Sequence, residues 1–218
     1  MSLPLLQLAL DHTELDAALS TAQQLHPHVD IIEAGTLLCL SCGVEAVRRL
    51  RHQHPEKTLV ADYKVADAGG TLADRAFTAG ASWMTVICAA PLATFASALD
   101  VAQQHEGDIQ IELFGNWTLE DARQWRQLGL KQAIYHRGRD AQASGQQWNQ
   151  HDLDTMKALS DMGFALSITG GITPQDLSQF KDVDVKAFIT GRALSDPASG
   201  IQRAAEFHQA IASIWGTV

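Results

Sequence analysis

The sequence has few cationic side chains for its 218 residues. Lysine and arginine number 16 and aspartate and glutamate number 25, which gives a formal net charge of −9. A negatively charged protein repels nucleic acid and anionic lipid at long range. We therefore expect no nucleic-acid partner and no membrane partner, and any anionic ligand must be held by local groups.

Three further features are absent, and each disfavours a class of protein. No segment has the roughly 18 consecutive apolar residues of a membrane span, and residues 1–11 lack the basic start of a secretion signal, so we expect a cytoplasmic protein. Cys39, Cys42 and Cys88 are the only cysteines. No second cysteine pair or nearby histidine completes a zinc set, so packed, reduced thiols are expected. A GxGxxG motif is also missing, which disfavours an open nucleotide-binding sheet.

What the sequence contains is a regular alternation of short apolar runs and longer segments of helical period. This alternation is typical of repeated strand–helix units that form a parallel sheet. Eight strands are predicted, at residues 5–11, 29–35, 58–65, 83–89, 108–114, 132–136, 165–169 and 187–191. The amphipathic helices predicted between them include residues 14–26, 44–54, 119–128 and 153–162. Eight such units in this length predict a single (β/α)8 TIM barrel, with residues 1–218 as one catalytic domain.

Polar residues recur where the predicted strands end. They are Asp11, Glu33, Asp62, Lys64, Glu112, His136 and Thr169. In a barrel, the C-terminal ends of the strands converge on one mouth, where loops surround a small ligand. A single residue of this kind would more simply cap a helix or bond a loop. So many at the same kind of position indicate an active site.

Charge is concentrated on the third predicted strand. Asp62 and Lys64 lie two positions apart and therefore on the same face. A buried cation beside carboxylates stays charged and can stabilise a substrate oxyanion, although an ion-pair ladder that only fills the barrel is the alternative. Glu33, on the neighbouring strand, and Asp62 could together supply oxygen ligands to Mg2+. His136 suits that metal poorly and is assigned to proton donation or to orienting water, helped by Arg139.

Glycines follow the last two predicted strands. Gly170 and Gly171 come after the seventh strand, and Gly191 comes after the eighth, where Arg192 adds a guanidinium. Glycines let backbone N–H groups approach an anion, and TIM-barrel phosphate sites lie after these two strands. Either cluster alone could be a turn. Together they predict a phosphate site, to which the N-terminus of a following helix would contribute.

With these residues in view, the sequence resembles the orotidine 5'-monophosphate decarboxylase superfamily. The likeness rests on the motif Asp-x-Lys-x-x-Asp, here DYKVAD at residues 62–67. It extends over nearly the whole chain, through residues 8–11, 30–35, 135–137, 169–171 and 191–192. Within the superfamily, the chain is most similar to the enzymes that decarboxylate 3-keto-L-gulonate 6-phosphate.

The resemblance implies a Mg2+-dependent carboxy-lyase that forms L-xylulose 5-phosphate and CO2 through an enediolate, in the context of L-ascorbate degradation. It implies that Lys64 stabilises the enediolate and that Asp67 serves the active site of the partner subunit in a homodimer. His136 and Arg139 would be associated with protonating the intermediate. Glu33 and Asp62 would hold the metal. The implied substrate-binding positions are Asp11, Asp62, Glu112, Thr169, Gly170, Gly171, Gly191 and Arg192.

Several alternatives remain open. D-arabino-hex-3-ulose 6-phosphate synthase forms a similar enediolate but adds it to formaldehyde, and the shared metal site does not separate the two. A non-catalytic sugar-phosphate-binding barrel could keep Gly171 and Arg192 while losing the metal and base residues. Ribulose-phosphate epimerase would be expected to show more than one histidine near the strand ends, whereas only His136 fits well. Orotidylate decarboxylation would not require the Glu33 ligand.

Two features depart from the expected pattern. Tyr63 sits inside the motif where a small residue would be less conspicuous. By strand alternation its side chain is expected to point away from the mouth, with little effect on chemistry. Gly69 and Gly70 are expected to loosen the turn that follows the motif.

Overall fold

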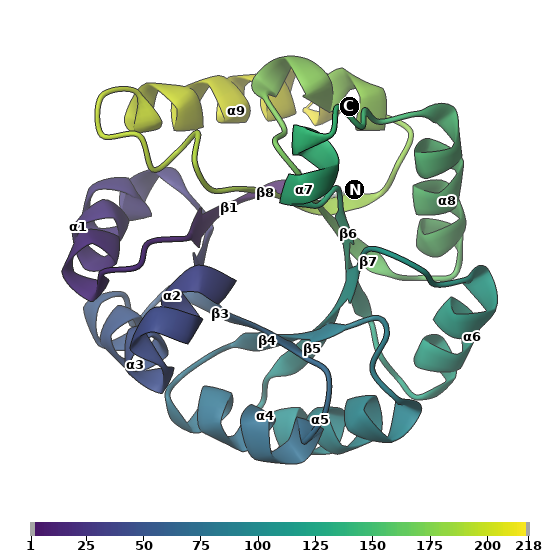
Figure 1. Ribbon diagram of the computed structural model, residues 1–218. Helices are drawn as coiled ribbons and strands as arrows, with labels where there is room; N and C mark the ends of the chain where they lie inside the picture. Colours follow the sequence, from purple (N-terminus) through teal and green to yellow (C-terminus); the bar gives the residue numbers. More distant parts are fainter. Residues whose placement is uncertain (1–2, 217–218) are drawn as a thin grey trace.

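The computed structural model describes residues 3–216 as a closed barrel of eight parallel strands. The strands follow one another around the barrel in sequence order, and the last strand pairs with the first. Figure 1 looks along the barrel axis, with the strands around the centre and the helices as an outer ring. The predicted (β/α)8 fold is confirmed.

The strands coincide closely with the apolar runs of the sequence. Their bounds are β1 Leu5–Leu10, β2 Ile31–Ala34, β3 Thr58–Val65, β4 Trp83–Ile87, β5 Asp108–Leu113, β6 Gln132–His136, β7 Ala165–Thr169 and β8 Val185–Thr190. The predictions for β3, β6 and β7 are confirmed to the residue, and the other five differ by one or two residues at their ends. These differences fall at the strand ends, where the hydrogen-bonded ladder ends and a loop begins.

The helices surround the sheet and also contribute to its mouth. Their bounds are α1 Leu15–Leu25, α2 Thr36–Cys42, α3 Val44–Gln53, α4 Gly69–Thr78, α5 Leu92–Gln104, α6 Leu119–Gln127, α7 Arg139–Ala143, α8 Gln150–Asp161 and α9 Gly200–Trp215. Two 3-10 helices, η1 His26–His28 and η2 Pro174–Phe180, complete the set. In Figure 1, α2 and α7 lie inside the outer ring, near the barrel opening.

Local signals explain where two of these helices begin. At α6 the side chain of Thr118 accepts from the backbone N–H of Asp121, whose side chain accepts from Thr118 in return, as expected of a capping box. Asn149 and Asp152 make the same arrangement at α8. The predicted start of α8 at residue 153 was therefore wrong by three residues, because Asn149 is the cap.

The barrel interior is closed below the mouth by small apolar clusters. Ala9, Ile134 and Ile189 form one buried cluster and also line the cavity above it. Ile31, Val60 and Ala187 form a second cluster inside the barrel. The cavity floor therefore includes apolar residues, and the buried carboxylate of Glu33 lies level with Ala9.

Gly69 and Gly70 do not loosen the turn after β3, so that expectation was wrong. They form the first turn of α4, and a Cβ at Gly69 would lie 2.1 Å from the backbone oxygen of Thr94 in α5. Gly69 instead permits close packing of the two helices. Tyr63 packs against the core and is absent from the cavity lining, which confirms its expected direction.

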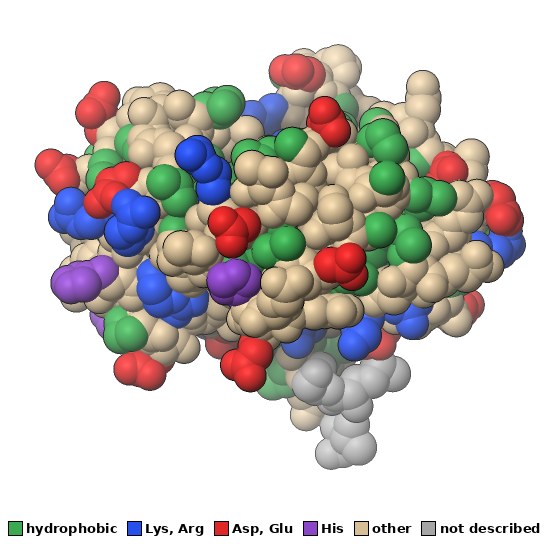
Figure 2. Space-filling view, turned by 90° about the horizontal axis from the view of Figure 1, so that it is seen from below, with side chains coloured by type: hydrophobic (Ala, Val, Ile, Leu, Met, Phe, Trp, Pro, Cys, Tyr) green, Lys and Arg blue, Asp and Glu red, His purple; other side chains and the backbone are tan. Residues whose placement is uncertain are grey.

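The surface carries dispersed charge. Figure 2 shows acidic side chains spread over one side of the molecule among basic, polar and apolar ones. Within residues 3–216, no helix is both long and apolar enough to cross a bilayer. Cys39, Cys42 and Cys88 are free and at least partly buried, as expected.

Candidate active site

A cavity of about 710 Å³ opens at the C-terminal ends of the strands. It gathers side chains from seven of the eight strands or their following loops, and residues 138–142 line one side. The predicted site residues on its wall are Asp11, Glu33, Asp62, Lys64, Glu112, His136, Arg139, Thr169, Gly170, Gly171, Gly191 and Arg192. Of the predicted site residues, only Asp67 lies elsewhere.

Lys64 stands between two buried carboxylates. Its Nζ lies 2.6 and 2.8 Å from the two oxygens of Asp62 and 3.0 Å from Oε1 of Glu112. Burial alone would lower the pKa of Lys64, but the negative charges of Glu112 and Asp62 raise it overall. The side chain is therefore a fixed ammonium at neutral pH.

The backbone of Lys64 has an irregular conformation for a strand residue. Its φ is 46°, in the left-handed region, and the pairing of β3 with β4 shifts between Ala61 and Val65. The N–H of Lys64 donates to Oγ1 of Thr85 at 2.9 Å, which anchors the irregular residue to β4. Asp62 and Lys64 share the cavity as predicted, but through a bulge rather than by simple alternation.

Asp62 is held from three sides. Besides Lys64, it accepts hydrogen bonds from Oγ1 of Thr36 at 2.6 Å and Oγ1 of Thr85 at 2.8 Å. Burial by itself would raise the pKa of Asp62, but the Lys64 ammonium and these hydrogen bonds lower it overall. Asp62 is thus a buried, ionised carboxylate.

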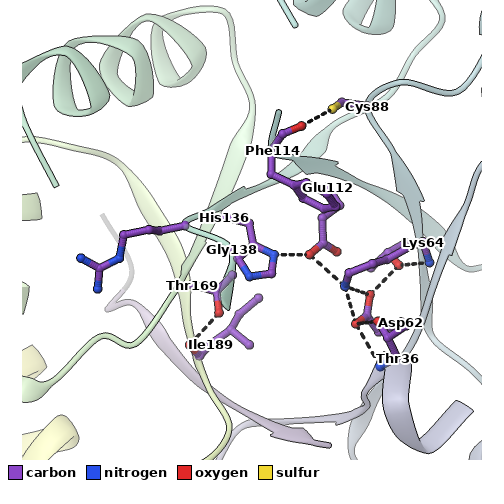
Figure 3. A network of polar contacts seen from close by, with 12 residues as sticks. Thr36, Asp62, Lys64, Cys88, Glu112, Phe114, His136, Gly138, Thr169 and Ile189 are labelled. Carbon is purple, nitrogen blue, oxygen red and sulfur yellow. Dashed lines mark hydrogen bonds and ion pairs between the residues drawn. The ribbon is translucent and has the colours of Figure 1, made fainter. Parts of the chain in front are cut away.

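Glu112 connects the ammonium to the histidine. Its Oε1 lies 2.5 Å from Nδ1 of His136 and 3.0 Å from Nζ of Lys64. Figure 3 shows this continuous row of contacts from His136 through Glu112 and Lys64 to Asp62 and Thr36. Because Nδ1 faces the carboxylate, Nε2 is the ring nitrogen left for other partners.

The remaining predicted polar residues lie around this row. Nη2 of Arg139 is 2.7 Å from Oδ2 of Asp11, which ties α7 to the end of β1 across the mouth. Oγ1 of Thr169 donates to the carbonyl oxygen of Ile189 at 3.1 Å, as Figure 3 shows. His12 contacts Thr21 instead and is absent from the cavity wall.

The two glycine loops offer unpaired donors. Gly170 and Gly171 have φ of 126° and 63°, which favour glycine. Within residues 3–216, the N–H groups of Gly171 and Arg192 donate no hydrogen bond, and the guanidinium of Arg192 makes no ion pair. The helix that follows the β7 loop is the 3-10 helix η2, which begins at Pro174 and is capped by Thr173 and Asp176. A contribution of its N-terminus to anion binding stays a prediction.

The chemistry of the donors fits a divalent cation. Glu33 and Asp62 are buried carboxylates on paired strands, and Glu33 accepts a hydrogen bond from Gln7. Burial raises the pKa of Glu33, and the negative charge of Asp62 raises it further, a cost that a bound cation would relieve. No group of three or more His, Cys, Asp or Glu with metal-site geometry occurs among the described residues. Substrate or water oxygens would therefore complete the coordination.

Asp67 is solvent-exposed, just before α4. It does not line the cavity of its own chain. Its predicted role at the active site of a partner subunit stays a prediction.

Sequence reasoning did not assign a role to Arg137 or Gln142, although both line the cavity. Arg137 donates to the carbonyl oxygen of Gly170, and Gln142 donates to the carbonyl oxygen of Arg137. The signal available in the sequence was the cationic side chain next to His136. Its partner, 33 residues away, is visible only in the folded chain.

Comparison with known proteins agrees with this geometry. Residues 4–207 match the orotidine 5'-phosphate decarboxylase / HUMPS family. The chain is 64% identical over 216 residues to 3-keto-L-gulonate-6-phosphate decarboxylase SgbH of Escherichia coli K12, covering 99% of this chain and 98% of the relative. It is 50% identical to 3-keto-L-gulonate-6-phosphate decarboxylase UlaD of E. coli O17:K52:H18, covering 99% and 100%.

A solved structure extends the comparison. The 3-keto-L-gulonate-6-phosphate decarboxylase of Vibrio cholerae superposes with a TM-score of 0.94 at 48% identity, covering 98% of this chain and all of the other. The chain therefore belongs to the orotidine 5'-phosphate decarboxylase / HUMPS family, and within it to the carboxy-lyases of the 3-keto-L-gulonate-6-phosphate decarboxylase group.

Proposed function

We propose that this chain catalyses the Mg2+-dependent decarboxylation of 3-keto-L-gulonate 6-phosphate to L-xylulose 5-phosphate and CO2 through an enediolate. The observation that carries the proposal is the Lys64 ammonium, held at 2.6 Å from Asp62 and 3.0 Å from Glu112 in the cavity. The names of relatives that share 64% and 50% of its residues support the substrate. L-ascorbate degradation is the metabolic context that we propose with it.

The substrate is a β-keto acid, so the carbonyl can accept the electron pair released with CO2. The bond between C1 and C2 breaks, and its electron pair moves through C2 and C3 onto the C3 oxygen. Lys64 stabilises the negative charge that grows there, and Asp62 and Glu112 keep the ammonium charged and in place. This fixed cation acts on charge that is larger in the transition state than in the substrate.

The enediolate must then gain a proton at C2. His136 is placed for this step because Glu112 orients the ring through Nδ1 and leaves Nε2 for proton transfer, directly or through water. Arg139, held by Asp11, adds positive charge at the same side of the mouth. Protonation restores the C3 carbonyl and yields L-xylulose 5-phosphate.

Binding is divided between two ends of the cavity. Glu33 and Asp62 would hold Mg2+, which when bound supplies polarisation of adjacent substrate oxygens. At the other end, the free N–H groups of Gly171 and Arg192 and the Arg192 guanidinium are suited to the phosphate. The remaining predicted contacts, Asp11, Glu112, Thr169, Gly170 and Gly191, lie between or beside these ends.

The test is CO2 release from 3-keto-L-gulonate 6-phosphate by the native protein, with Mg2+ and after treatment with EDTA. We expect release that EDTA abolishes and that Lys64→Met lowers by about 100-fold or more. Lys157→Met is the matched control, because Lys157 forms an exposed ion pair with Asp161 on α8. No release by the native protein would reject the proposal.

A synthase reaction is the second candidate. A solved 3-hexulose-6-phosphate synthase is 31% identical, with a TM-score of 0.88 over 94% of this chain. Product formed from D-ribulose 5-phosphate and formaldehyde, without CO2 release from the keto acid, would move the assignment to that reaction.

We also propose a homodimer in which Asp67 completes the partner's active site. The exposed position of Asp67, outside the cavity of its own chain, supports this proposal. Lys64→Met and Asp67→Ala should each be inactive alone. Co-expressed, they should regain about one quarter of native activity, because random pairing leaves one intact site in each mixed dimer. Activity retained by Asp67→Ala alone, or no recovery on mixing, would contradict this arrangement.

A further inference from the structure

Arg137 makes several contacts that converge on the glycine loop after β7. Its Nε and Nη2 donate to the carbonyl oxygen of Gly170 at 3.0 and 2.6 Å. Its Nη1 donates to the carbonyl oxygen of Gln146 at 3.3 Å. The guanidinium also lies over the ring of Trp148, 4.9 Å from the centroid. These contacts fix the planar group and, with it, the Gly170 carbonyl.

The position of this carbonyl determines the direction of a neighbouring donor. The C=O of Gly170 and the N–H of Gly171 belong to one planar trans peptide and point in opposite directions. Holding the carbonyl on Arg137 therefore turns the Gly171 N–H away from the guanidinium. That N–H has no acceptor within the described chain, and Gly171 lines the cavity.

Atoms of the segment that follows β6 lie close to both glycines. A Cβ at Gly170 would lie 2.5 Å from the carbonyl oxygen of Arg137, and a Cβ at Gly171 would lie 2.2 Å from Oε1 of Gln142. Trp148 packs edge-on against the buried Phe180 of η2, with ring centroids 5.6 Å apart. Arg137 and Trp148 thus connect the segment before α8 to the loop and helix that follow β7.

We propose that Arg137 is a positioning residue for the phosphate group of the substrate. It acts through the peptide between Gly170 and Gly171, whose N–H it directs toward the anion. The inference rests on the proposed function because it takes the substrate to be a sugar phosphate. Without the guanidinium, the peptide can turn, and binding of phosphate weakens while the bond-breaking groups at Lys64 stay in place.

Arg126 provides a matched control at the opposite end of the barrel. Its Nε donates to the carbonyl oxygen of Met162 at 3.1 Å, and its Nη1 donates to that of Leu130 at 2.6 Å. Its guanidinium lies over the ring of Phe164 at 5.4 Å. Arg126 therefore makes the same kinds of contact as Arg137, but before β6 and β7 rather than after them.

The experiment compares Arg137→Met, Arg137→Lys and Arg126→Met. In each variant we would measure kcat and KM for CO2 release, the inhibition constant of inorganic phosphate, and the Tm. For Arg137→Met we expect KM and the phosphate inhibition constant to rise about tenfold, with kcat changed by less than about threefold. Arg137→Lys keeps a charged donor, so its KM and phosphate inhibition constant should lie between those of Arg137→Met and the native protein. Arg126→Met should leave KM and the inhibition constant unchanged even where its Tm falls.

Three outcomes would overturn the inference. The first is that Arg137→Met leaves KM and the phosphate inhibition constant unchanged. The second is that Arg126→Met raises these two constants as much as Arg137→Met does. The third is that Arg137→Met lowers kcat alone. Calorimetry with inorganic phosphate alone tests the inference separately from turnover. If the native protein binds phosphate and Arg137→Met does not, Arg137 retains its role even if no CO2 is released and the proposed function fails.

Discussion

Nδ1 of His136 lies 2.5 Å from Oε1 of Glu112, so the carboxylate fixes which ring nitrogen is available for catalysis. We expect His136→Asn to lower kcat for CO2 release by about 100-fold, because general acid catalysis contributes a factor of this size. KM should change little, since the metal and phosphate ends of the cavity are untouched. His151→Asn is the control, because His151 is exposed on α8. Full turnover in His136→Asn would exclude the proton-transfer role.

Gly171→Ala tests the phosphate loop directly. Alanine at φ of 63° is strained, and its Cβ would lie 2.2 Å from Oε1 of Gln142. We expect KM to rise by about tenfold or more, because the loop must shift to admit the methyl group. Gly129→Ala carries a similar backbone strain at φ of 98°, but between α6 and β6, away from the mouth. It should lower the Tm without changing KM, and a shared effect on KM would contradict this view of the loop.

The adjacent glycines of α4 should respond in opposite ways. Gly69→Ala places a methyl group 2.1 Å from the Thr94 backbone oxygen, so α4 and α5 must separate. We expect it to lower the free energy of unfolding by about 2 kcal/mol or more. In Gly70→Ala the nearest contact is an ordinary 3.5 Å, and alanine favours the helix by up to about 1 kcal/mol. Urea denaturation of the two variants measures the contrast, and equal effects would refute it.

His54 should make the fold sensitive to mild acid. Burial lowers the pKa of His54 below its usual 6.5, and the charges of His26 and Lys57 lower it further. A depressed folded-state pKa means that the unfolded chain takes up the proton first. The contribution of His54 to the free energy of unfolding is therefore fully present above pH 6.5, and it is lost as the pH falls through the folded-state pKa.

Thermal unfolding between pH 7.5 and 5 measures this effect. We expect the Tm of the native protein to fall with pH more steeply than that of His54→Leu, which cannot be protonated at this position. His52→Leu should retain the native slope, because His52 is exposed in the last turn of α3, the helix that His54 follows. Parallel curves for the native protein and His54→Leu would show that His54 does not contribute.

The sequence was sufficient for the architecture because strand and loop signals are local. Apolar runs such as that of β7 end in polar or glycine residues, and the order of such runs leaves few topologies open. The groups on the mouth were predictable for the same reason, since they directly follow the strands. The direction of Tyr63 followed from alternation alone.

What could not be predicted depends on contacts between distant segments. The left-handed φ of Lys64 is set by its bond to Thr85, 21 residues away. The role of Gly69 is set by the approach of Thr94, and that of Arg137 by Gly170. None of these contacts is visible in the hydrophobic periodicity of the sequence. Asp67 does not line the cavity of its own chain, so its predicted role is not explained by the contacts within one subunit.

The pairing of β8 with β1 also bears on how the gene for this barrel could be rearranged. Trp215, at the end of α9, packs at a tilt against Phe188 of β8, which pairs with Leu6 at the start of β1. The end of α9 and the start of β1 thus lie against adjoining strands. New termini at Gly129, on the opposite side from the mouth, would leave every strand-to-loop segment of the cavity uncut. A circular permutant opened there should fold and keep its catalytic groups.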